Sequence, residues 1–140
     1  MSRPPVLAAS FVAALLVCVG GCEEGERKFD EPVVVAGDTV PPDTLREGEF
    51  HYMRWCAGCH GPEGAGDGPR ARAAERPPPD FGKRDWRRAP VSPGELPPDA
   101  YFGKVVREGI PGTIMTGMPI SDEDLPALIT YVKYLSEKGR

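Results

Sequence analysis

Two cysteines and a histidine form the most specific chemical pattern in this sequence: Cys56, Cys59 and His60 lie within HYMRWCAGCHGPEG. Two thiols at this spacing are compatible with zinc binding, with thiol redox chemistry or with a disulfide. A zinc site needs further ligands, and a thiol–disulfide module needs strands around the cysteine pair. The sequence supplies neither, because His51 is the only other histidine and no segment alternates as a strand does.

The histidine directly after the second cysteine narrows the chemistry to covalent haem attachment, which uses this spacing. Two thiols so placed reach the two vinyl groups on one side of the macrocycle, and the imidazole can swing beneath the iron. We therefore predict one covalent haem c held by Cys56, Cys59 and His60. Residues 45–140 contain little apolar material for their length, and a haem would supply part of their core.

Three helices are predicted to position this motif. They run from Asp43 or Thr44 to about Cys56, from Asp99 to Gly109, and from Ser121 to near the C-terminus. The last is the clearest, since a serine can cap it and apolar residues recur along it at helical spacing. Glycines and prolines fill residues 57–96, which predicts a long loop with at most a short helical turn at residues 70–75.

Four more residues occupy characteristic positions on the first and the last of the three predicted helices. The first helix carries Gly48 and, four residues later, Tyr52, which precedes the first cysteine by four; the last helix carries Leu128 and Tyr131. Together with the cysteine–histidine motif, residues 45–135 resemble a class I c-type cytochrome. The resemblance implies an all-α fold, with about three main helices and long loops wrapped around one covalent haem. It also implies that the first and last helices cross at the glycine.

The resemblance further implies a methionine as the second axial ligand, placed in the irregular stretch before the last helix. Met115 lies in a GTIM sequence six residues before Ser121, whereas Met118 precedes a proline and lies three residues before Ser121. We predict Met115, with Met118 as the alternative. Pro69, nine residues after His60, matches the proline whose carbonyl accepts a hydrogen bond from the proximal imidazole in this family.

The N-terminal residues 1–21 are predicted to be an export signal of the lipoprotein type. Arg3 precedes an apolar stretch, Val6–Val19, that is too short to span a bilayer comfortably. The following Gly20-Gly21-Cys22 resembles the end of a bacterial lipobox, so we predict cleavage before Cys22 and a lipid on its thiol. Ordinary cleavage nearby is the alternative. The protein would then be a membrane-anchored lipoprotein on the periplasmic side.

The charge distribution separates a tether from a domain. Residues 22–44 are acidic and contain three prolines, which predicts a flexible tether. Residues 45–140 form the predicted cytochrome c domain, whose fourteen basic and fourteen acidic residues give no nucleic-acid-binding surface. The basic segment 70–88 is a solvated face, a docking patch for a partner, or a set of groups that neutralises the haem propionates, with Trp86 as a donor.

The resemblance implies electron transfer and not catalysis. A haem c with His/Met axial ligation would carry single electrons between exported or membrane-bound redox partners, without a small-molecule substrate. Two alternatives remain open. One is a haem subunit fixed in a respiratory complex, and the other is a catalytic or ligand-sensing haem protein with an open iron site.

Overall fold

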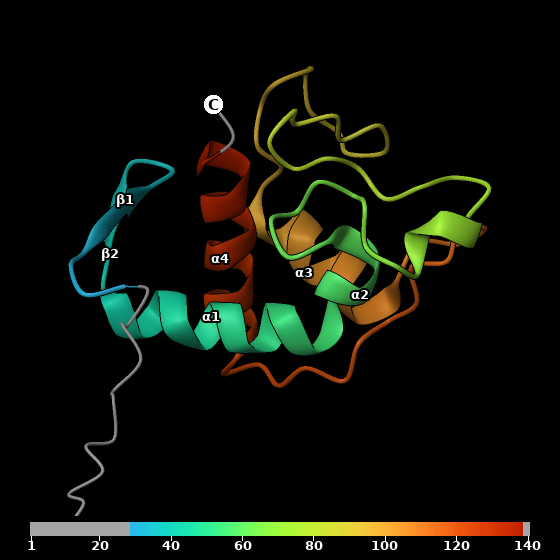
Figure 1. Cartoon of the computed structure of the whole chain (residues 1–140). Coiled ribbons are helices and arrows are strands. Elements are labelled where there is room, and N and C mark those ends of the chain that lie inside the picture. Colours follow the sequence, from blue (N-terminus) through green and yellow to red (C-terminus); the bar gives the residue numbers. More distant parts are fainter. Residues whose placement is uncertain (1–28, 139–140) are drawn as a thin grey trace, which may run out of the picture.

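Two helices far apart in the sequence form the frame of the fold. In the computed structural model, which describes residues 29–138, α1 (Pro42–Trp55) crosses α4 (Leu125–Lys138), and these two share the largest contact between elements (Figure 1). The short α2 (Ala57–His60) follows α1 directly, and α3 (Asp99–Glu108) packs on α4. The other elements are β1 (Val33–Val35), β2 (Asp38–Val40) and the 3-10 helix η1 (Ala71–Ala73).

Gly48 allows α1 and α4 to approach closely. A Cβ added at this position would lie 2.2 Å from the carbonyl oxygen of Ala127 and 2.7 Å from Cβ of Tyr131. Beside the contact, the fully buried rings of Tyr52 and Tyr131 pack with their centroids 5.4 Å apart. The predicted crossing of the first and last helices at the glycine is therefore confirmed.

The last helix begins later than its sequence predicts. Ser121 Oγ accepts a hydrogen bond from the amide of Asp124 at 3.0 Å, but this bond closes a turn that precedes α4. Pro126 has no N–H to donate to the carbonyl of Asp122, so the regular helical ladder is interrupted there. The ends of α1 and α3 and the helical turn in the loop agree with their predictions to within a few residues.

A β-hairpin precedes α1, in a stretch whose sequence shows no strand alternation. β1 and β2 pair antiparallel through a tight turn at Ala36-Gly37, where both residues have positive φ. Val35, Val40 and Phe29 are buried in the core shared with α4. Strands of three residues are too short to show an alternating pattern, and their stabilising contacts lie at the other end of the chain. The residues from Phe29 onward, assigned to the flexible tether, thus belong to the folded part.

A buried arginine joins the long loop to α4. Arg84 donates to the carbonyls of Gly94 at 3.2 Å and Ser136 at 3.4 Å, and its guanidinium pairs with Glu137 at 3.4 Å. The same Glu137 accepts a hydrogen bond from the amide of Ala36 in the hairpin turn. The end of α4 therefore binds both the long loop and the hairpin.

The predicted export signal, residues 1–21, and the predicted lipidation site, Cys22, lie outside the described residues. Within residues 29–138, no helix is long and apolar enough to cross a membrane.

Candidate functional site

The cysteine–histidine motif lies at the C-terminal end of α1. The amide of Cys56 still donates to the carbonyl of Tyr52 at 2.8 Å, and the amide of His60 donates to the carbonyl of Cys56 at 2.9 Å. The chain thus passes from α1 into α2 with little interruption. Cys56, Cys59 and His60 all line one cavity, and both cysteines are half-buried and do not form a disulfide.

The cavity is large and predominantly apolar. Its volume of about 510 Å³ lies within the range of pockets that hold organic cofactors. Opposite the motif, α3 contributes Phe102, Val105 and Val106, and α4 contributes Leu128 and Val132. A flat apolar molecule would fit between these helices and the motif.

Two buried polar atoms around the cavity lack a hydrogen-bond partner among residues 29–138: Nδ1 of His60 and Nε1 of Trp86. Buried nitrogen atoms are almost always hydrogen-bonded, so the orphaned indole nitrogen of Trp86 indicates a group that the polypeptide does not supply. The indole of Trp86 is suited to donate to a carboxylate such as a haem propionate. The residues present therefore fit a haem.

Burial sets the protonation of the motif. It lowers the pKa of His60 to about 4, so the imidazole is neutral at ordinary pH, the form that ligates metals. Burial, assisted by neighbouring Cys59, raises the pKa of Cys56 to about 12. Reactive redox cysteines have a lowered pKa, so this environment is unsuited to a thiol–disulfide module.

The hydrogen bond expected from His60 to the carbonyl of Pro69 is not seen among residues 29–138, and the role of Pro69 at the haem stays a prediction. The loop does lie beside α2, since the amides of Gly68 and Arg70 donate to the carbonyls of Cys59 and Gly58. The ring of His60 is instead oriented by stacking on Phe81, with the centroids 4.8 Å apart, and its Nδ1 is left without a partner.

Both candidate axial methionines lie at the cavity. The segment after α3 folds back on itself: the amide of Ile110 donates to the carbonyl of Met115 at 2.9 Å, and the amide of Met118 donates to the carbonyl of Val106 at 2.8 Å. Met115 and Met118 consequently line the same cavity as His60. His51 is not among the lining residues, and its imidazole faces Asp124.

Sequence reasoning missed the aromatic wall of the cavity. Phe81 stacks on His60 and also on Trp86, at 5.2 Å between centroids, and Tyr101 completes the lining. Phe81 lies in an irregular loop, where hydrophobic periodicity gives no signal. The basic segment is divided by the fold: Arg76, Arg87 and Arg88 line the cavity, whereas Arg84 is buried in its ion pair with Glu137.

Comparison with known proteins agrees with this geometry. Residues 43–132 match the family described as cytochrome c oxidase, cbb3-type, subunit III. Among solved structures, the chain is similar to one in the Kuenenia stuttgartiensis reducing HAO-like protein complex, with 33% sequence identity and a TM-score of 0.51. That match covers 64% of this chain and 41% of the other, so the chain spans less than half of its neighbour. No match was found among curated proteins.

The expected helical cytochrome c fold is confirmed by the family match together with the structure. Because the matched region contains the whole cysteine–histidine motif and most of the cavity lining, the chain belongs to the cbb3-type cytochrome c oxidase subunit III family and carries a covalently bound haem c.

Proposed function

We propose that this protein transfers single electrons, with Cys56 and Cys59 as the haem attachment sites and His60 as the proximal ligand. The observation that carries the proposal is the convergence of these three side chains on one apolar cavity, with the imidazole kept neutral by burial. When bound, haem supplies reversible one-electron chemistry. The apolar walls of the cavity limit the access of water.

Met115 is the proposed second axial ligand, with Met118 as the alternative. Met118 packs against core residues, and its amide is bound to the end of α3, which gives it a structural role. Met115 is half-buried at the bend of the loop, where its amide is held by the hydroxyl of Thr113 at 3.1 Å. A thioether is a soft ligand that raises the potential of haem iron.

The ligand assignment can be tested by replacing each methionine in turn. Met115→Ala is expected to abolish the weak far-red absorption band of methionine-ligated ferric haem. It should also lower the potential by on the order of 0.1 V, because axial ligands spread haem potentials over about 0.8 V. The matched control, Met118→Ala, should keep the band. Absorption spectroscopy and redox titration measure both effects.

Other outcomes of this experiment are equally informative. Loss of the band in Met118→Ala alone would transfer the assignment to Met118. If the oxidised wild-type protein shows no far-red band and its reduced form binds carbon monoxide readily, the iron has an open position. Electron transfer through a His/Met-ligated haem would then be the wrong proposal, and a catalytic or ligand-sensing role the better one.

A fixed place in a protein complex is the second candidate function. The matched family is named for an oxidase subunit, and the structural neighbour is part of a protein complex. Both names support redox proteins as the partners. Purification of the native protein from membranes distinguishes the candidates, because a fixed subunit copurifies with its complex and a mobile carrier does not.

We also propose that the protein is anchored on the periplasmic side by a lipid on Cys22. Replacing Cys22 with serine is expected to block lipid attachment and normal processing, since the lipobox cysteine provides the thiol that is modified. Mass spectrometry of the mature N-terminus and fractionation of cells measure the result. A wild-type mature protein that starts at another residue and stays in the soluble fraction contradicts the anchor.

A further inference from the structure

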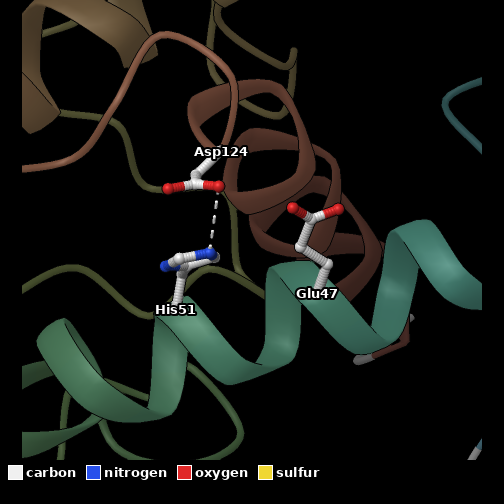
Figure 2. A group of neighbouring side chains, drawn as sticks. All are labelled: Glu47, His51 and Asp124. Carbon is white, nitrogen blue, oxygen red and sulfur yellow. Dashed lines mark ion pairs between the residues drawn. The ribbon is translucent and has the colours of Figure 1, made fainter.

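A second cluster of potential metal ligands lies outside the haem cavity. Glu47 and His51 are one helical turn apart on α1, and Asp124 lies immediately before α4 (Figure 2). One ligand atom from each side chain lies within 4.8 Å of the other two. None of the three residues lines the cavity beside the cysteine–histidine motif. Haem binding therefore does not explain why these three potential ligands lie together.

The carboxylate of Asp124 is held in position by its own turn. Ser121 Oγ accepts a hydrogen bond from the amide of Asp124 at 3.0 Å and donates one to Asp124 Oδ2 at 2.7 Å. The remaining oxygen, Oδ1, is the one that faces His51. The bond to Oδ2 thus fixes the carboxylate with Oδ1 facing the imidazole, so the ligand is partly preorganised.

The distance between the two less exposed ligands, which Figure 2 marks as an ion pair, also fits an intervening ion. His51 Nε2 lies 3.6 Å from Asp124 Oδ1. An N–H···O hydrogen bond would be shorter, roughly 2.7–3.2 Å. Two ligands of a tetrahedral zinc ion, each about 2.0–2.1 Å from the metal, are separated by about 3.4 Å. The observed spacing is close to that of ligands sharing one ion.

We propose that Glu47, His51 and Asp124 bind a divalent first-row transition-metal ion, with Zn²⁺ as the best fit. One imidazole and two carboxylates suit zinc, and they would balance its two charges. The imidazole disfavours Mg²⁺ and Ca²⁺, which prefer oxygen ligands. His51 is largely buried, with 15% of its side chain exposed, whereas Glu47 is exposed and gives the ion a route from solvent. Water completes the coordination.

The position of the site gives the ion a structural effect. It joins the middle of α1 to the turn that ends the loop carrying Met115, so a bound ion fixes that turn against the helix that leads to the cysteine–histidine motif. Because an ion that binds only the folded state stabilises it, thermal unfolding should move to higher temperature in the presence of Zn²⁺. The proposal does not depend on the function of the haem.

The test is a zinc titration of the haem-loaded, tag-free mature protein after removal of metals, followed by calorimetry. We expect one Zn²⁺ per chain and no heat with Mg²⁺. His51→Gln and Asp124→Asn should each weaken binding at least tenfold. Glu123→Gln is the matched control: Glu123 is exposed, adjacent to Asp124 and outside the cluster, and its substitution removes the same charge. The Glu123→Gln variant should bind Zn²⁺ with the same affinity as the wild type.

Nuclear magnetic resonance of the reduced protein gives an independent readout. Zinc at saturation should shift the Nε2 signal of His51 and leave the haem absorption spectrum unchanged. The proposal is overturned if binding is not saturable at one equivalent, or if Asp124→Asn and Glu123→Gln weaken it equally. An unmoved His51 signal at saturation overturns it as well.

Discussion

Replacing Gly48 with alanine is expected to destabilise the folded protein by about 3 kcal/mol, at the upper end of the range for overpacking a core. The added Cβ would lie 2.2 Å from the carbonyl oxygen of Ala127, which belongs to the backbone of α4 and cannot rotate away. The two helices must then separate, and the packing of Tyr52 on Tyr131 is lost. Denaturant unfolding of the haem-loaded protein measures the change.

The same substitution in α3 provides the matched control. A Cβ added at Gly103 would have Leu125 Cδ2 at 3.4 Å as its nearest neighbour, which is an ordinary contact. Gly103→Ala is therefore expected to be neutral or to stabilise by up to about 1 kcal/mol, because alanine is the better helix former. Equal stability changes in the two variants would show that the close approach of α1 to α4 does not limit stability.

Replacing both Cys56 and Cys59 with alanine is expected to abolish covalent attachment of the haem. The two half-buried thiols are the only cysteines among residues 29–138, and both line the cavity. Wild-type protein on a denaturing gel should stain for haem-dependent peroxidase activity, and the double variant should show no stain.

Each single variant keeps one thiol and should retain attachment at reduced yield, which separates loss of a bond from loss of the fold. Haem that acidic acetone extracts from the wild-type protein would contradict thioether attachment.

Local chemistry made much of the site predictable. Cys56, Cys59 and His60 lie within five positions of the sequence, so their motif can be recognised without knowledge of the fold. They follow the end of α1 and line the cavity. The helix crossing at Gly48 was predicted from the resemblance to class I c-type cytochromes, and the structure contains it. The ends of α3 follow from Pro98 and Gly109, residues that begin and end helices by their own backbone preferences.

Features that depend on distant contacts could not be predicted in the same way. The hairpin is stabilised by burying Val35 and Val40 near α4, which no local pattern reveals. Phe81 became part of the site because the loop that carries it folds back over α2, where the amide of Phe81 donates to the carbonyl of Gly64. The stacking of His60 on that ring likewise depends on a residue 21 positions further along the chain.

The burial of Phe29 limits the length of the tether between the proposed lipid and the folded part of the protein. With a lipid on Cys22, as proposed, seven residue steps separate the lipidated residue from Phe29, which is buried, and a fully extended chain spans at most about 25 Å over that distance. Phe29 lies beside the N-terminal part of α1, where its carbonyl accepts a hydrogen bond from Arg46. The cysteine–histidine motif follows the other end, about 21 Å away along a helix of 14 residues. The lipid would therefore hold the N-terminal end of α1 close to the membrane. The haem-binding motif, which follows the other end of α1, would lie farther from the membrane and be accessible to redox partners.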